Sequence, residues 1–285
     1  MCDVIVKTRV DGEFFNVKDT LECGQVFRFK KSRKGYKVYS QDRCAYVYNE
    51  EGETILITTE EDKEYFENYF DLKRDYSQIV NDAISQGYEI LTKSAIIGKG
   101  VRILKQDKLE TLFSFLISQN NNIPRIKNII EKLCIGLGEV KYFEGEEYYS
   151  FPTPQKMAQA PLEFFKSIGL GYRAEYIKRL AEQICDGLDV NDFDLLSTIQ
   201  LKKELVNLYG VGPKVADCVS LFGFNRTDSF PVDTWIAKVY EQDFDGKLKD
   251  RKKIAEWFTQ KFGNSSGYFQ QYLFYYKRTL SKESD

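Results

Sequence analysis

The sequence predicts an α+β fold, in which an N-terminal antiparallel β-sheet domain is followed by an all-helical domain. Up to about residue 60, hydrophobic residues alternate with the period of strands, and beyond it they recur with the spacing of helices. The 285 residues are enough for two domains, while 6 prolines and 19 glycines are too few for a long disordered tract. We therefore expect a β-rich domain with flanking helices at 1–106 and a helical domain at 107–285.

The first domain contains segments that alternate as strands do. They are rich in β-branched and aromatic residues, which favour strands, and turn-forming residues separate several of them. Short strands that follow one another in this way predict an antiparallel meander. The strand segments are 4–8, 25–30, 36–39, 45–48 and 54–57.

Helical spacing begins with Tyr65, Tyr69 and Leu72 and continues to the end of the chain. Glycine or proline separates most of the later helical segments, as expected where helices end. The further predicted helices are 109–116, 125–136, 155–165, 174–187, 200–208, 215–222, 234–241, 250–262 and 266–280.

The segment 93–108 carries five lysines and arginines and one aspartate. Basic residues at this density are typical of a solvated loop, and they also suit a surface that contacts DNA phosphates. The segment alone does not decide between the two interpretations.

The composition excludes several kinds of chemistry. The chain has no histidine, which rules out a Ser-His-Asp triad, a Cys-His pair and histidine-ligated zinc. Its six cysteines are too far apart in sequence for a C-x-x-C metal site, and they fit reduced thiols in the cytoplasm. No apolar run is long enough for a signal peptide or a membrane span. We expect no metal, no organic cofactor and no membrane partner.

The most informative stretch is 201–240. Leucines spaced three and four residues apart predict a short helix over 201–208, Gly210 fits the left-handed residue that ends it, and Pro213 fits the first position of the next helix. The exposed amides of so tight a turn, at the positive end of a helix, can bind a phosphate without a basic side chain, although similar turns also occur merely as packing elements. The predicted phosphate-binding residues are Gly210, Val211, Gly212 and Val215.

Two residues of this stretch suit catalysis. Lys214 lies one residue inside the second helix, where the helix dipole disfavours an ammonium, so it either meets a phosphate or supplies a neutral, nucleophilic amine. Asp233 stands where a helix N-cap belongs, and its carboxylate could also stabilise a cationic sugar or accept a proton. Both roles of Asp233 are compatible, because capping holds the carboxylate in place.

The segments 210–218 and 231–235 resemble those of the helix-hairpin-helix DNA glycosylases. Within that superfamily the resemblance is greatest to the 8-oxoguanine DNA glycosylase/AP lyase branch. Four further segments agree with that branch and follow in the family's order. They are GQVFRF (24–29), residues 100–126, GLGYRAEY (169–176) and GYFQQYLF (267–274). The resemblance implies an N-terminal antiparallel β domain, a helical domain built around a helix-hairpin-helix motif, and a monomer.

The resemblance further implies that the enzyme flips 8-oxoguanine out of duplex DNA, removes it and nicks the abasic site without a cofactor. Lys214 matches the Schiff-base lysine that attacks C1′ of the sugar, and Asp233 matches the aspartate that stabilises the oxocarbenium-like centre. The chain departs from animal and fungal members at Trp235, where they carry a histidine near the 5′ phosphate of the lesion. An indole can stack, but it carries no charge to that phosphate.

Residues that would recognise the lesion also follow from the resemblance. Gly24 matches the residue whose carbonyl accepts the N7–H that 8-oxoguanine has and guanine lacks, and Gln270 matches the reader of the Watson–Crick edge. Phe274 and Cys218 match the two faces of the base sandwich. Without the resemblance, Phe274 and Cys218 would be interpreted as core residues and Gly24 as a β-bulge.

On the opposite strand, Asn120 matches the residue that fills the gap left by the flipped nucleotide. Arg125 and Arg173 match the arginines that bind the estranged cytosine, and Tyr172 matches a wedge beside it. The asparagines alone would be interpreted as a capping loop, with Asn122 as the cap, and the arginines as surface residues or phosphate contacts.

Two other functions stay open at this point. One is a monofunctional alkylpurine glycosylase that uses Asp233 and water, although that branch lacks the lysine found at Lys214. The other is a non-catalytic DNA-binding module that uses the hairpin only for phosphates. The expected location is the cytoplasm of a prokaryote, in association with the nucleoid.

Overall fold

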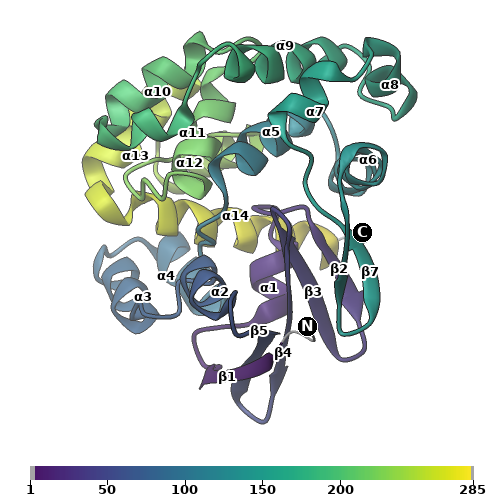
Figure 1. Ribbon diagram of the computed structural model, residues 1–285. Helices are drawn as coiled ribbons and strands as arrows, with labels where there is room; N and C mark the ends of the chain where they lie inside the picture. Colours follow the sequence, from purple (N-terminus) through teal and green to yellow (C-terminus); the bar gives the residue numbers. More distant parts are fainter. Residues whose placement is uncertain (1–3, 284–285) are drawn as a thin grey trace.

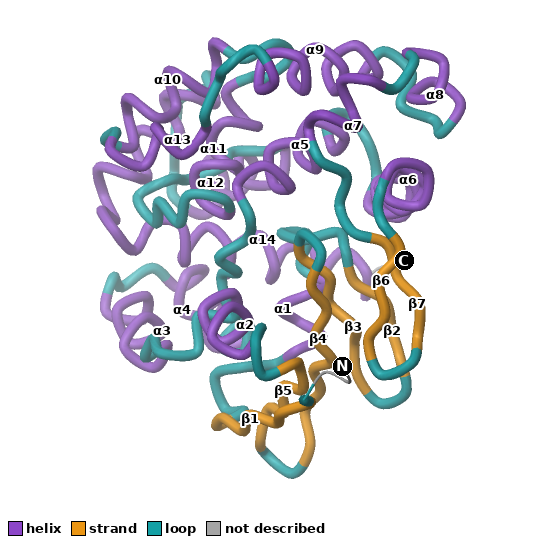
Figure 2. The backbone as a smooth tube through the Cα atoms, in the orientation of Figure 1, coloured by secondary structure: helices purple, strands orange, loops and turns teal. Residues whose placement is uncertain are grey.

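The N-terminal sheet has five antiparallel strands in the order β1-β5-β4-β3-β2, in a computed structural model that describes residues 4–283 (Figures 1 and 2). Strands β2 to β5 form the predicted meander, and β1 pairs with β5 at the edge. The strands are β1 (Ile5–Asp11), β2 (Phe29–Ser32), β3 (Gly35–Ser40), β4 (Arg43–Glu50) and β5 (Glu53–Thr59).

One strand prediction is wrong in part, because residues 25–28 precede β2, and of their backbone groups only the carbonyl of Arg28 is bonded to β3, by the amide of Tyr39 at 3.0 Å. Gln25 is 1% exposed, and its side chain bonds backbone groups on two segments: Nε2 donates to the carbonyl of Arg102 at 2.7 Å, and Oε1 accepts from the amide of Leu104 at 2.9 Å. Gln25 is thus held by hydrogen bonds of its side chain and not by backbone pairing with a neighbouring strand. A helix that the sequence did not predict, α1 (Val17–Glu22), lies between β1 and this segment.

The later part of the chain is mainly helical, so the predicted fold class is confirmed. The long helix predicted over 155–165 is divided at Pro161, because proline cannot donate a helical hydrogen bond. The helices are α2 (Lys63–Tyr69), α3 (Tyr76–Ser85), α4 (Glu89–Ile97), α5 (Lys108–Ser118), α6 (Ile123–Leu137), α7 (Pro154–Gln159), α8 (Leu162–Ser167), α9 (Arg173–Cys185), α10 (Thr198–Asn207), α11 (Pro213–Phe222), α12 (Thr234–Asp243), α13 (Arg251–Phe262) and α14 (Ser266–Glu283). Short 3-10 helices cover Val190–Leu195 and Gly263–Ser265.

The helical part also contains a small hairpin, β6 (Val140–Phe143) and β7 (Glu146–Tyr149), which the sequence analysis did not identify. Its turn residues Glu144 and Gly145 both have positive φ, 49° and 77°. A two-residue turn of this kind suits the twist of antiparallel strands, so Glu-Gly between two short aromatic segments was a usable signal.

The hydrophobic core of the helical domain includes helices that precede residue 107 in the sequence. Tyr76 and Ile79 of α3 and Leu91 of α4 belong to the same buried cluster as the helical domain, and α14 packs against α4 (Figure 1). A separate cluster fills the space between the sheet, α1 and α2. The division of the chain at residues 106 and 107 stays a prediction.

A buried ion pair joins the sheet domain to α5. Arg28 donates to Glu110 at 3.0 Å, and both side chains are buried. Arg28 also donates to the carbonyl of Tyr149 at 2.7 Å, and Glu110 accepts from the amide of Gln41 at 2.7 Å. Burial raises the pKa of Glu110, and the charge of Arg28 opposes that rise. The pair therefore holds α5, which carries an aromatic wall of the cavity described below.

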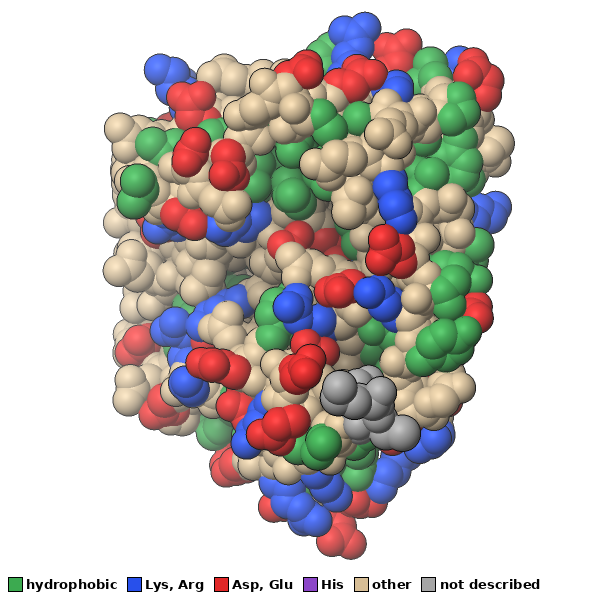
Figure 3. Space-filling model, in the orientation of Figure 1, with side chains coloured by type: hydrophobic (Ala, Val, Ile, Leu, Met, Phe, Trp, Pro, Cys, Tyr) green, Lys and Arg blue, Asp and Glu red, His purple; other side chains and the backbone are tan. Residues whose placement is uncertain are grey.

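The basic segment 93–108 does not form a free basic surface. Arg102 is 6% exposed and donates to the carbonyl of Asp71 at 2.7 Å, while Lys105 pairs with the carboxylate of Asp71 at 2.7 Å. Lys108 pairs with Asp194. On the face seen in Figure 3, acidic and basic side chains are interspersed. The segment thus joins parts of the fold, and backbone amides remain the better candidates for phosphate binding.

None of the helices within residues 4–283 combines the length and the apolar character needed to cross a lipid bilayer.

Candidate active site

The predicted hairpin connects α10 to α11. Gly210 has the left-handed φ of +84° that ends the first helix, and Gly212 and Pro213 begin the second. A Cβ atom at Gly210 would lie 2.5 Å from the ring of Tyr176 on α9, so only glycine fits there. Gln119, at the end of α5, donates to the carbonyl of Gly210 at 3.0 Å. Two neighbouring segments therefore hold the hairpin in place.

The side chains of Val211 and Val215 point into the core, where they are 5% and 2% exposed. Only the backbone of these two residues could meet a phosphate. Phosphate binding by the predicted four residues stays a prediction.

We predict that Gly210→Ala lowers stability and DNA affinity together. The substitution forces a Cβ into the Tyr176 ring and an L-residue into a left-handed conformation, at a cost of about 1–3 kcal/mol. Thermal unfolding and DNA binding at fixed salt would measure both effects. For the stability effect alone, Gly212→Ala is the matched control, because its φ is −89° and its Cβ would meet nothing within 4 Å. An unchanged melting temperature for Gly210→Ala would contradict the prediction.

Six of the predicted site residues line one cavity of about 60 Å³. They come from four parts of the chain: the turn after α1, the first two turns of α11, the start of α12 and the middle of α14. The six residues are Gly24, Lys214, Cys218, Asp233, Gln270 and Phe274. Phe115, Phe222, Pro231 and Gln271 complete the lining.

Lys214 is the second residue of α11, and its side chain is exposed where it lines the cavity. Its Nζ lies 5.5 Å from the centre of the Phe115 ring. The neighbouring carboxylate, Asp217, pairs with Lys202 at 2.8 Å. Throughout the described residues, the ion pairs do not include Lys214. The amine is therefore accessible and lies at the positive end of a helix without a salt bridge.

Asp233 caps α12, as its position in the sequence predicted. Its Oδ1 accepts a hydrogen bond from the amide of Ile236 at 2.9 Å, and the residue is half-buried. A carboxylate has two oxygens, so capping by one leaves the second for the cavity.

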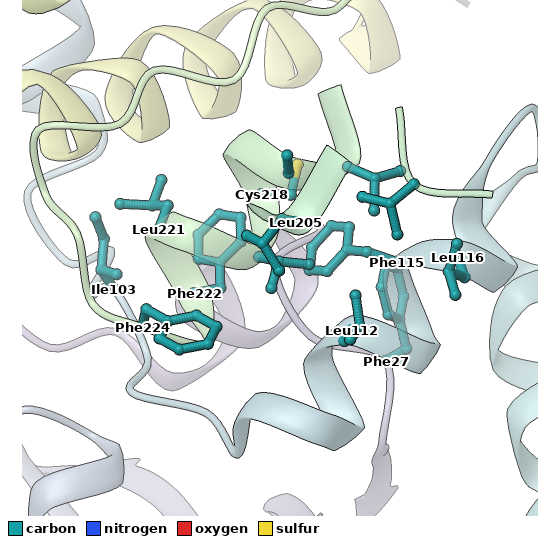
Figure 4. Close-up of a cluster of buried hydrophobic side chains, with 14 of the residues drawn as sticks. Phe27, Ile103, Leu112, Phe115, Leu116, Leu205, Cys218, Leu221, Phe222 and Phe224 are labelled. Carbon is teal, nitrogen blue, oxygen red and sulfur yellow. The ribbon is translucent and has the colours of Figure 1, made fainter. Parts of the chain in front are cut away.

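The apolar walls of the cavity come from three helices. Cys218 lies one turn after Lys214 on α11, and burial raises the pKa of its thiol against the opposing charge of Lys214, so it stays protonated and acts as an apolar surface. Phe115 and Phe222 stack with ring centres 5.6 Å apart (Figure 4). Phe274 faces the cavity from α14 and is half-buried. Phe222 could have been inferred from its spacing of four residues after Cys218.

Gln270 presents an acceptor to the cavity. Its Nε2 donates to the carbonyl of Pro231 at 3.2 Å, while its buried Oε1 has no hydrogen-bond partner among the described residues. One of the two N–H donors on Nε2 is thus engaged, and the carbonyl oxygen is unpaired. Such an acceptor matches the N1–H and amino donors on the Watson–Crick edge of guanine.

Gly24 lies in the turn between α1 and β2, so the interpretation as a β-bulge is wrong. Its φ is +98°, and a Cβ there would lie 3.2 Å from Nη1 of Arg278 on α14. The same Nη1 donates to the carbonyl of Glu22 at 2.9 Å. The C-terminal helix therefore closes over this turn.

The predicted opposite-strand residues lie on two neighbouring loops. Arg173 is 4% exposed and donates to the carbonyls of Gln119 and Asn120, the second at 2.9 Å, so the interpretation as a surface arginine is wrong for it. Arg125 is exposed and donates to the carbonyl of Gly169 at 3.1 Å. Tyr172 is 54% exposed and lies against the guanidinium of Arg173.

These loops lie outside the lining of the Lys214 cavity. They are connected to the hairpin next to it by the hydrogen bond from Gln119 to Gly210. Asn122 caps α6 by accepting from the amide of Arg125 at 3.0 Å, as predicted.

Three larger cavities share no lining residue with this site, and the smallest of them, about 300 Å³, is lined by Asp107, Phe113 and Lys156 among others. One of about 590 Å³ lies between the sheet, α6 and β7, and one of about 820 Å³ lies between α10, α11 and α13. The second is lined by Pro213, Ala216 and Asp217 of α11 and contains the Lys202–Asp217 ion pair. The smaller cavity is the better candidate for an active site, because six of the residues that the sequence singled out line it together.

Two family models together match most of the chain. Residues 7–112 match the N-terminal domain of 8-oxoguanine DNA glycosylase, and residues 113–263 match the HhH-GPD superfamily base excision DNA repair protein.

Two solved relatives agree with this chain over nearly its full length, and a curated relative agrees over about three quarters of it. The protein MBOgg1, solved in complex with a low-affinity DNA ligand, is 36% identical with a TM-score of 0.91, and the match covers 99% of this chain and 100% of that one. The 8-oxoguanine glycosylase/lyase of Clostridium acetobutylicum, solved with double-stranded DNA containing cytosine opposite 8-oxoG, is 35% identical with a TM-score of 0.89, over 98% and 99%. A probable N-glycosylase/DNA lyase of Methanothermobacter thermautotrophicus is 29% identical over 76% of this chain and 75% of the relative.

Proposed function

The chain belongs to the HhH-GPD superfamily of base excision DNA repair proteins, and from this membership we infer a bifunctional enzyme that excises 8-oxoguanine from DNA and cleaves the strand at the abasic site. It binds DNA, as its solved relatives do. One observation supports the assignment of the chemistry to particular residues. Lys214, Asp233 and four candidate base-contacting residues line a single cavity.

We assign the nucleophile to Lys214. The neutral amine bonds to C1′ of the flipped nucleotide while the C1′–N9 bond breaks, and the base leaves with that electron pair. Opening of the sugar ring then gives an imine between Nζ and C1′. The imine acidifies the C2′ proton, and loss of this proton expels the 3′ phosphate by breaking the C3′–O bond.

Asp233 has two supporting roles in this scheme. Its carboxylate accepts the proton that the ammonium of Lys214 must lose, and it stabilises the positive charge that develops on the sugar. Its cap bond to Ile236 supports these roles, because a fixed carboxylate needs no reorganisation when the charge appears.

The lesion is recognised by a polar edge and two apolar faces. The carbonyl of Gly24 accepts the N7–H of 8-oxoguanine, whereas guanine would place a lone pair against it. The free Oε1 of Gln270 accepts from the Watson–Crick edge, and Cys218 and Phe274 enclose the base.

We further propose that the substrate is duplex DNA with cytosine opposite the lesion and that the enzyme acts as a monomer. Asn120, Arg125, Tyr172 and Arg173 would contact the opposite strand, and the exposure of Arg125 and Tyr172 supports this. Nζ of Lys238 lies 5.4 Å from the indole ring of Trp235, and we propose that this ammonium contacts the lesion-strand phosphate. The cytoplasmic, nucleoid-associated location stays a prediction.

Cleavage of matched duplexes tests the function. We expect strand scission of a duplex with 8-oxoguanine opposite cytosine and none of the duplex with guanine in its place. Borohydride added during turnover should reduce the imine and leave a covalent protein–DNA adduct. A monofunctional glycosylase would release the base without an adduct, and a binding module would leave both duplexes intact.

A further inference from the structure

A second glutamine, Gln271, lies in the same cavity and has no role in the scheme above. It is 3% exposed and follows Gln270 on α14. Its Nε2 is buried and makes no hydrogen bond of normal geometry to any residue the structure describes. A buried amide donor without an acceptor is costly, so its position in a binding cavity points to an acceptor on the ligand.

Among the described residues, the one candidate acceptor for the Gln271 amide that the electrostatics indicate is the thiol of Cys23, and this thiol already makes other hydrogen bonds. It donates to the carbonyl of Thr20 at 3.1 Å and accepts from Nε2 of Gln25 at 3.3 Å. Burial raises the pKa of Cys23, with Gln25 and then Gln271 opposing the rise, so the thiol stays protonated. A protonated thiol is a weak acceptor and leaves the amide of Gln271 largely unsatisfied.

We propose that Gln271 contacts the lesion, and that its Nε2 donates a hydrogen bond to the O8 atom of the flipped 8-oxoguanine. This inference rests on the proposed function. Gln271 lines the same cavity as Gly24, the residue whose carbonyl accepts N7–H in that scheme. O8 is attached to the ring carbon next to N7, so a donor beside Gly24 meets it on the same edge of the base.

The two glutamines thereby divide the polar edges of the base between them. Gln270 offers a free acceptor, Oε1, and Gln271 offers a free donor, Nε2. Guanine carries a C8–H where the lesion carries O8, so it would leave the Gln271 donor unpaired. It would also place the lone pair of N7 against the carbonyl of Gly24. The lesion is therefore distinguished at two adjacent atoms, which strengthens discrimination by polar groups.

The test compares Gln271→Met with the wild type in single-turnover excision. Methionine keeps the length of the side chain and removes its donor. We expect excision of 8-oxoguanine opposite cytosine to fall by about 5- to 100-fold, the effect of leaving one polar contact unmade. A substrate with 2-amino-8-oxopurine, which lacks O6 and keeps O8, should show the same fold loss. Cleavage of a preformed abasic site, which has no base to contact, should show no such loss.

Gln183→Met makes the same chemical change at an exposed position of α9 and should leave excision unchanged. Three outcomes would overturn the proposal. The first is equal excision by Gln271→Met and the wild type. The second is a loss that disappears with the substrate lacking O6, which would assign the contact to O6. The third is an equal loss of abasic-site cleavage, which would indicate a structural role. Failure of the wild type to excise 8-oxoguanine would instead refute the proposed function itself.

Discussion

Lys214→Gln is expected to lose both base excision and strand cleavage, with a fall of roughly 10³-fold or more in single-turnover excision. Glutamine has a similar length but no amine, so no bond to C1′ and no imine can form. The fold should be retained, because the Lys214 side chain is exposed and the described ion pairs do not include it. Borohydride trapping measures the loss directly, since the adduct requires the imine.

A matched control is Lys132→Gln, which removes one positive charge from an exposed position of α6 outside the cavity. It should form the adduct at the wild-type rate. An undiminished adduct with Lys214→Gln would show that another amine attacks the sugar, and the assignment of the nucleophile would then be wrong.

Asp233→Asn should reduce excision by about 10²- to 10³-fold while leaving the melting temperature nearly unchanged. Asparagine caps helices about as well as aspartate, so the bond from Ile236 can be kept and only the charge is lost. Without that charge, the developing cation on the sugar has no counter-charge, and the proton of Lys214 has no acceptor. Excision rates and thermal unfolding of the same preparation would separate the two roles.

The chain offers a close control in Asp250, which caps α13 by accepting from the amide of Lys253 at 2.9 Å and lies outside the cavity. Asp250→Asn should keep full activity. Asp233→Ala should lose activity as Asp233→Asn does and also lose about 1 kcal/mol of stability, because the cap disappears. Near-normal excision by Asp233→Asn would mean that the residue is only a cap.

Local rules explain why much of the site was predictable. The left-handed Gly210, the proline that begins α11 and the capping Asp233 depend on a few neighbouring residues, and the structure has all three as expected. The antiparallel sheet followed from its period-two alternation in the same way. The division of roles among the gathered residues came from the family resemblance and stays a prediction.

Other features depended on contacts between distant segments. Residues 25–28 alternate like a strand but are drawn out of the sheet by buried side-chain bonds to 102–104. The basic residues of 93–108 look free in the sequence, yet two of them, Lys105 and Lys108, form ion pairs with Asp71 and Asp194. Arg173 looks like a surface residue and is buried beneath the loop that its guanidinium holds.

By itself the sequence determined the sheet, the hairpin and the positions of Lys214 and Asp233 at the starts of two helices, because capping, turn conformation and hydrophobic period are local properties. Only the tertiary structure decided which polar atoms in the cavity are left without partners, since that depends on every element packed around them. Gln270 and Gln271 are chemically identical neighbours in the chain. Among the described residues, Gln270 keeps an unpaired Oε1 while its Nε2 donates to Pro231, whereas the unpaired atom of Gln271 is its Nε2.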